Sequence, residues 1–131
     1  MKDIKAKENG MSLEDNAKYI EGLKKTLEEN EGEVAAIIAQ PYNHGNFFDN
    51  AFPVDGFWQE VRKLCTEKDI VLIVDDVRAG FRLDLAGSDH FFGFEADLIC
   101  FCKALANGYN MSALCGGEHM KATVSGITYT G

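Results

Sequence analysis

The stretch that decides the fold reads Ile70-Val71-Leu72-Ile73-Val74-Asp75, and a second stretch of the same kind reads Leu98-Ile99-Cys100-Phe101-Cys102-Lys103. Each begins as a continuous apolar run, without the apolar–polar alternation of a strand that has one wet face. Such runs are typical of strands buried on both faces, as in a parallel sheet. Each run is followed by one ionisable residue, Asp75 or Lys103, where we expect the strand to stop.

The positions of Asp75 and Lys103 predict a ligand site. In open α/β sheets the ligand lies outside the carboxyl ends of the strands. An amine and a carboxylate at that edge can hold a carbonyl cofactor as an imine and keep its ring nitrogen protonated, which is the chemistry of pyridoxal 5'-phosphate. The structural alternatives are a lysine that extends along the surface from a strand end and an aspartate that caps the next turn.

Upstream of these runs the pattern predicts a helix and a strand. Ser12 is a helix-start residue, and Asp15 three positions later can close a capping box. We expect this helix to end near Asn30. Residues 34–39 are then an expected strand that Pro41 stops, because proline has no N–H to donate to a sheet.

A second helix is expected between this strand and the first apolar run. Residues 57–65 carry apolar side chains at helical spacing. Strand, helix and strand then form a unit whose two strands should lie side by side and parallel. Farther along, Asn107-Gly108 and Cys115-Gly116-Gly117 are expected to form turns, since glycine tolerates positive φ.

The composition is that of a single globular domain. The chain has 131 residues, of which 46% are hydrophobic and 26% charged, enough for one core. No apolar stretch approaches the roughly 20 residues of a membrane helix, and the polar N-terminus is unlike a secretory signal, so we expect a cytoplasmic protein and no membrane partner. The net charge of −8 argues against nucleic acid as a partner.

The cysteines and histidines predict no metal centre. The spacing Cys100-Phe101-Cys102 is unlike that of structural zinc sites, and free cysteines in apolar segments behave as small hydrophobic residues. His44, His90 and His119 have no arrangement around them that indicates a hydrolytic triad, and we expect them on the surface or in loops.

Four segments in order carry a family resemblance. They read Val34-Ala35-Ala36-Ile37-Ile38-Ala39-Gln40-Pro41, then Asp75-Asp76-Val77-Arg78-Ala79-Gly80-Phe81, then Gly93-Phe94-Glu95-Ala96-Asp97-Leu98, and finally Lys103-Ala104-Leu105-Ala106-Asn107-Gly108-Tyr109. Their order and spacing resemble the class III pyridoxal-phosphate-dependent aminotransferases, including the branch similar to glutamate-1-semialdehyde aminomutase. The resemblance implies an α/β, three-layer, mainly parallel sheet with flanking helices, which is the large domain of a fold-type I enzyme.

The resemblance implies roles for individual residues. Lys103 would form a Schiff base with pyridoxal 5'-phosphate and afterwards shuttle a proton as general base and acid. Asp75 would pair with the pyridine nitrogen, and Val77 would pack against the cofactor ring. We expect Lys103 to be buried against Phe101 and Leu105, which would favour its neutral amine.

Three positions match the family pattern less well than the others. Arg78 stands where Gln is usual, near the cofactor's phenolic oxygen; either it forms a salt bridge with Asp76 or Asp84, or it marks a subgroup with a different substrate. Gln40 replaces a usual Glu. Thr128 resembles the threonine that reaches the cofactor phosphate of the neighbouring subunit, unless a hydroxyl residue beyond the last residue fills that role.

By resemblance, the enzyme would move an amino group between an amine or amino acid and a keto or aldehyde acceptor, or within one substrate as an aminomutase does. The full-length form would be a homodimer, because cofactor sites of this family lie at a subunit interface. The match covers roughly residues 12–131, and the resembled enzymes are much longer. We therefore expect residues 1–131 to be a single, partial large domain, either an excerpt or a truncated product.

The alternative function is that of a truncated, non-catalytic α/β domain that keeps the fold but lacks turnover. A flavodoxin-like binding domain is disfavoured, since Gln40-Pro41-Tyr42-Asn43-His44 is no glycine-rich phosphate loop.

Overall fold

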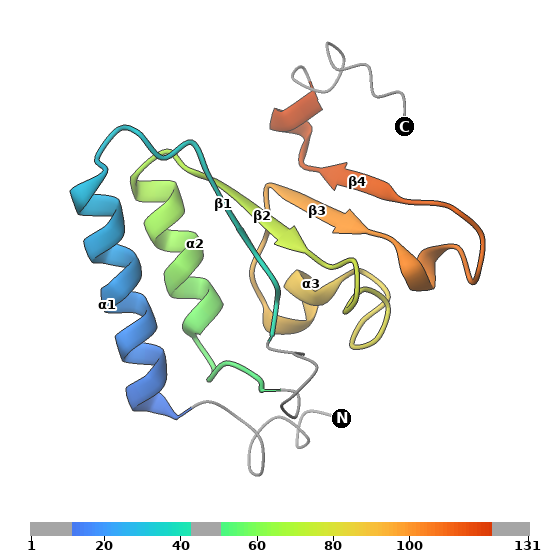
Figure 1. Ribbon diagram of the computed structural model, residues 1–131, viewed down its shortest axis with the longest axis horizontal. Coiled ribbons are helices and arrows are strands. Elements are labelled where there is room, and N and C mark those ends of the chain that lie inside the picture. The colour runs from blue at the N-terminus through green and yellow to red at the C-terminus, as the bar shows by residue number, and fades with distance from the viewer. Residues whose placement is uncertain (1–11, 43–50, 122–131) are drawn as a thin grey trace.

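The computed structural model describes residues 12–42 and 51–121 (Figure 1). They form a four-stranded sheet in the order β1-β2-β3-β4. The pairs β1·β2 and β2·β3 are parallel, and β4 runs antiparallel to β3. The strands are β1 (Ala36–Ala39), β2 (Val71–Asp75), β3 (Leu98–Phe101) and β4 (Ala113–Gly116).

Three α-helices flank this sheet. In Figure 1, α1 and α2 run side by side, and α2 contacts β2, while the short α3 begins at Ser88, which is bonded to Asp76 just after β2. Two single-turn 3₁₀ helices follow β3 and β4. The helices are α1 (Leu13–Glu29), α2 (Phe57–Glu67), α3 (Ser88–Phe92), η2 (Lys103–Leu105) and η3 (Glu118–Met120).

The predicted start of α1 is confirmed. The Asp15 N–H donates to Ser12 Oγ at 3.1 Å, and the Ser12 N–H donates to Asp15 Oδ2 at 3.3 Å, which closes the capping box. The helix ends at Glu29, near the expected place, and the N–H of its C-cap residue Asn30 donates to Thr26 O. Ile20 and Leu27 of this helix are buried, whereas Leu13 in its first turn is 77% exposed.

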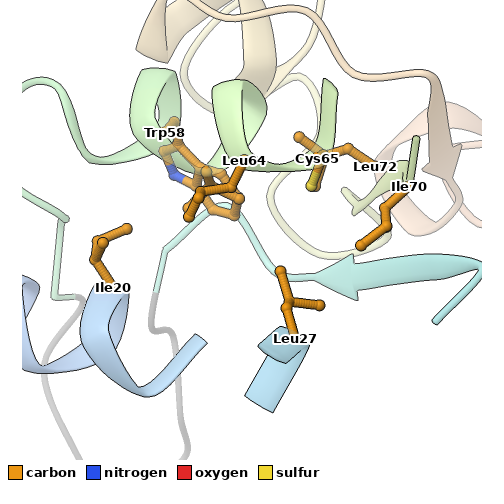
Figure 2. Close-up of a cluster of buried hydrophobic side chains, with 8 residues drawn as sticks. Ile20, Leu27, Trp58, Leu64, Cys65, Ile70 and Leu72 are labelled. Atoms are coloured by element: carbon orange, nitrogen blue, oxygen red, sulfur yellow. The ribbon is translucent and has the colours of Figure 1, made fainter. Parts of the chain in front are cut away.

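The main core lies between α1, α2 and the sheet (Figure 2). Trp58 is its largest member: its indole N–H donates to Pro41 O at 2.8 Å, and its ring stacks on Phe94 with centroids 4.9 Å apart. Fully burying one such large apolar side chain stabilises a fold by about 1.5–3 kcal/mol. The buried members are Ile20, Leu27, Trp58, Val61, Leu64, Cys65, Ile70 and Leu72.

The helices of the described residues cover one face of the sheet. Leu72 and Val74 are fully buried, whereas Ile73 between them is only half-buried. Successive side chains of a strand point to opposite faces, and Ile38, the register partner of Ile73, is 64% exposed. The expectation that the apolar runs are buried on both faces is therefore wrong for these residues.

Three other expectations about local structure have different outcomes. Asn107 and Gly108 have φ of 48° and 104°, so the predicted turn is confirmed. Cys115 and Gly116 do not form a turn, because they belong to β4. The first strand is two residues shorter than expected and begins at Ala36.

Three further observations concern the cysteines, metal binding and membrane-spanning helices. All four cysteines are free, and Cys65 is buried as its position on α2 predicted. Among residues 12–42 and 51–121, no group of three His, Cys, Asp or Glu side chains lies close enough to hold a metal ion. In the same ranges, no helix has both the length and the apolar character needed to cross a membrane.

Candidate functional site

Asp75 and Lys103 lie at the same edge of the sheet. Asp75 is the last residue of β2, and β3 ends at Phe101, two residues before Lys103. Because β2 and β3 are parallel, with Asp75 opposite Cys100 in the register, their carboxyl ends meet at one edge (Figure 1). The structure thus brings a carboxylate and an amine to the edge where an open α/β sheet binds its ligand.

The Asp75 carboxylate has one oxygen in use. This half-buried residue accepts a hydrogen bond from the Val77 N–H at Oδ1, over 3.2 Å, so it caps the turn after β2. Among the described residues, none donates a hydrogen bond to Asp75 Oδ2. The turn-capping alternative therefore describes a real contact, which leaves the second oxygen available to a ligand.

Lys103 is exposed, so the expected burial against Phe101 and Leu105 is wrong. The chain leaves β3 at Phe101, which is itself buried, and turns into η2, where Lys103 is the first residue. Its φ of 42° lies in the left-handed region.

Arg78 is exposed and forms no ion pair with Asp76 or Asp84, so the proposed salt bridge is wrong. Each carboxylate has another partner. Asp76 is bound by Ser88, and Asp84 Oδ2 lies 2.9 Å from Nδ1 of His90. Arg78 therefore has an exposed side chain in the turn after β2, next to the half-buried Val77. Gln40, which follows β1, is exposed at the corresponding end of that strand.

Two residues discussed from the sequence lie outside the described residues. They are Thr128, the candidate phosphate contact, and His44. The other two histidines are exposed, as expected.

Asp76, next to Asp75 in the chain, has a buried partner that the sequence did not predict. It is fully buried, and its carboxylate accepts both the Ser88 N–H, at 2.9 Å, and the Ser88 hydroxyl, at 2.6 Å. Burial raises the pKa of Asp76; the Ser88 hydrogen bonds oppose this effect without cancelling it, and the charges of Asp89 and Asp75 add to the rise. No local pattern joins residues 76 and 88, so sequence periodicity could not have found the pair.

Cys100 is the cross-strand neighbour of Asp75 and shares its environment. Burial raises the pKa of the Cys100 thiol, and the negative charge of Asp75 raises it further. Cys100 therefore borders the candidate site as a small, uncharged side chain.

A second polar cluster lies at the opposite end of the strands. The Asp97 carboxylate accepts hydrogen bonds from Arg62 Nη1 at 2.5 Å and the Leu72 N–H at 2.7 Å, and its other oxygen lies 2.9 Å from His119 Nε2. Burial acts to raise the pKa of Asp97, but these hydrogen bonds outweigh burial and the pKa is lowered.

A cavity of about 620 Å³ adjoins this cluster, and Arg62, Asp97 and His119 line it. It lies at the amino ends of β2 and β3, because Ile70, Val71 and Asp97 are also in its wall. The cavity is therefore separate from the edge that holds Asp75 and Lys103.

Comparison with known proteins shows where related sequences occur. The sequence model of the family described as Aminotransferase class-III matches residues 1–131. The 3-aminobutyryl-CoA aminotransferase of Cloacimonas acidaminovorans is 40% identical over 99 residues, which are 76% of this chain and 24% of that protein. The glutamate-1-semialdehyde 2,1-aminomutase of Prosthecochloris aestuarii is 41% identical over 112 residues, 84% of this chain and 26% of that protein. The chain spans about a quarter of the length of these relatives.

Solved structures agree with the sequence relatives. The FumI protein of Sphingopyxis sp. MTA144, in its PLP internal aldimine form, matches with a TM-score of 0.80 and 38% identity, over 86% of this chain and 27% of that one. An (S)-enantioselective omega-transaminase from Thermomicrobium roseum matches with a TM-score of 0.74 at 24% identity, over 89% and 26% of the two chains, and so shares the fold. The predicted α/β class, with a mainly parallel sheet and flanking helices, is confirmed.

Proposed function

The chain belongs to the class III aminotransferase family, and we propose from this premise that it is part of a pyridoxal 5'-phosphate-dependent enzyme. The enzyme would transfer an amino group between an amine or amino acid and a keto or aldehyde acceptor, or move it within one substrate as an aminomutase does. Both kinds of enzyme occur among the relatives. The observation that carries the proposal is the position of Lys103 and Asp75 at one edge of the sheet.

The residues at this edge suit the cofactor in their chemistry. Lys103 offers an exposed amine that can bond covalently to an aldehyde, and Asp75 keeps one carboxylate oxygen for a protonated ring nitrogen. When bound, pyridoxal 5'-phosphate supplies an electron sink for the bond broken at the substrate carbon.

Each residue would then have a defined task. Lys103 would hold the cofactor and would also move a proton to and from the substrate carbon as general base and acid. Asp75 would hold the ring nitrogen in its protonated form, Val77 would pack against the ring, and Arg78 would stand near the phenolic oxygen. Thr128 would bind the phosphate of a cofactor held by the neighbouring subunit.

The proposal extends to the full-length enzyme and its substrates. Because these relatives are about three times as long as this chain, residues 1–131 would be the central part of a large domain in a cytoplasmic, homodimeric enzyme. Its substrates would be a small-molecule amino donor and a keto or aldehyde acceptor.

The proposal is tested by trapping the lysine. The purified chain is mixed with pyridoxal 5'-phosphate and reduced with borohydride, which converts the C=N bond to a stable amine, and the modified peptide is located by mass spectrometry. We expect an adduct at Lys103 that Lys103→Ala abolishes and Lys121→Ala, at another exposed lysine, retains.

Scattered or absent labelling would contradict binding by this chain. It would favour instead the non-catalytic alternative, in which the fold is kept without a working site. The length of the chain relative to its relatives is the observation behind that alternative.

A further inference from the structure

Asp76 and Ser88 form a buried pair between the end of β2 and the start of α3. Asp76 is 0% and Ser88 1% exposed. Both carboxylate oxygens are used: Oδ2 accepts the Ser88 N–H at 2.9 Å, and Oδ1 accepts the Ser88 hydroxyl at 2.6 Å. The Asp76 carboxylate therefore joins the end of β2 to the start of α3 through two separate hydrogen bonds.

The main chain at Asp76 is held as well. Its carbonyl oxygen accepts the Gly80 N–H at 2.7 Å, which closes the turn that follows β2. A Cβ at Gly80 would lie 2.7 Å from that same oxygen and 2.7 Å from Cδ1 of Phe101, so the turn is packed directly against β3. Asp76 is thus constrained at both its side chain and its carbonyl.

These constraints determine the direction of Asp75. Val74 and Asp76 are both fully buried on the covered face of the sheet. Successive residues of an extended chain point to opposite faces, so anchoring both neighbours directs Asp75 to the other face, where it is half-buried. Within Asp75 itself, the Oδ1 contact to the Val77 N–H is 3.2 Å long, longer than either Ser88 bond.

From this arrangement we propose that Asp76, through its two hydrogen bonds to Ser88, is a positioning residue that aims the Asp75 carboxylate at the cofactor ring nitrogen. The inference rests on the proposed function, in which Asp75 is that partner. Asp76 touches neither cofactor nor substrate, because it is buried on the opposite face and acts only through the backbone it shares with Asp75.

The sharpest competing explanation is that the pair only stabilises the fold. Asp97 provides a matched control, since its carboxylate also accepts a backbone N–H and a side-chain donor but lies at the opposite end of β2 and β3. Asp97→Ala should lower thermal stability without disturbing Asp75. A measurement at the ring nitrogen therefore separates positioning from stability.

The experiment uses the chain with pyridoxal 5'-phosphate labelled with ¹⁵N in the ring, whose chemical shift reports protonation of that nitrogen. Affinity is measured on the same samples by absorbance titration. Ser88→Ala removes one hydrogen bond and keeps the backbone donor, so its fold is expected to persist. We expect Ser88→Ala and Asp76→Ala to move the ¹⁵N chemical shift of the ring nitrogen toward that of its unprotonated form. Asp76→Ala should also weaken the binding of pyridoxal 5'-phosphate about tenfold.

A conservative variant tests the mechanism of positioning. Asp76→Asn keeps an acceptor for the Ser88 N–H, and its amide can donate to the Ser88 hydroxyl. Asp76→Asn should therefore show the same ring-nitrogen chemical shift as the unsubstituted chain, although the charge of Asp76 is gone. A shift in Asp76→Asn that moves toward the unprotonated value would show that the charge of Asp76 acts on the ring, and would overturn a positioning role.

The remaining outcomes separate the two proposals. If Asp76→Ala and Ser88→Ala lower the melting temperature as Asp97→Ala does but leave affinity and shift unchanged, the pair is only structural and this inference is overturned. If the unsubstituted chain forms no adduct at Lys103, the proposed function itself is overturned, and the inference with it.

Discussion

Asp97 and Leu72 bind each other twice, since the Leu72 N–H donates to the Asp97 carboxylate at 2.7 Å and the Asp97 N–H donates to the Leu72 carbonyl at 2.9 Å. The residue just before β3 is thereby fixed to the second residue of β2. Arg62 from α2 and His119 from η3 join the same carboxylate. One side chain thus connects four elements at the amino ends of the strands.

Acid should release this cluster. The pKa of Asp97 is lowered in the fold, so its ionised form is stabilised there and contributes above its ordinary value of 3.8, and that contribution is lost as pH falls through the lowered value. We expect Asp97→Asn to lower the free energy of unfolding by about 1–3 kcal/mol at pH 7. It should also reduce the loss of stability between about pH 5 and pH 2. Urea unfolding across this range checks both; an unchanged acid dependence would contradict the prediction.

Two glycines should respond in opposite directions to alanine. A Cβ at Gly80 meets a backbone oxygen and an aromatic ring at 2.7 Å, and we expect Gly80→Ala to destabilise the chain by about 1–3 kcal/mol. Gly22 lies inside α1 with open space around it, so Gly22→Ala should stabilise by about 0.5–1 kcal/mol. Chemical denaturation of the pair provides the measurement, and equal effects of the two changes would be inconsistent with the packing described.

The Trp58 indole should matter beyond its size. Trp58→Phe keeps an aromatic ring but leaves the Pro41 carbonyl without its donor in a buried place, which should cost about 1–3 kcal/mol. Tyr19→Phe is the comparison, since Tyr19 is 62% exposed and its change should stay within about 0.5 kcal/mol. Thermal unfolding measures both changes. Equal melting temperatures for the two variants would show that the hydrogen bond from Trp58 to the Pro41 carbonyl does not contribute to stability.

The elements that could be predicted are those with a local signal. The capping residues Ser12 and Asp15 define the start of α1, and the continuous run that ends at Asp75 indicates a parallel strand. β4 was missed because Ala113-Leu114-Cys115-Gly116 has no β-branched residue and ends in glycine, so locally it looks like a turn. Its strand conformation comes from pairing with β3, which is a contact between distant segments.

The candidate site shows the same division. The shared edge of Asp75 and Lys103 follows from strand order and could be predicted, whereas the exposure of Lys103 depends on where the chain leaves β3. Nothing local sets Trp58 apart within the expected helix of residues 57–65, because its partner Pro41 lies in another segment. Asp76 and Ser88 are likewise joined only by the fold.

The backbone of Lys103 has an energetic meaning of its own. A left-handed φ of 42° places the Cβ of an L-residue against its own carbonyl, at a cost of about 1–2 kcal/mol that glycine would avoid. Selection for thermal stability alone would favour glycine at position 103. Under the proposed function, a lysine in this conformation would be a compromise in which some stability is given up for an amine at the edge of the sheet.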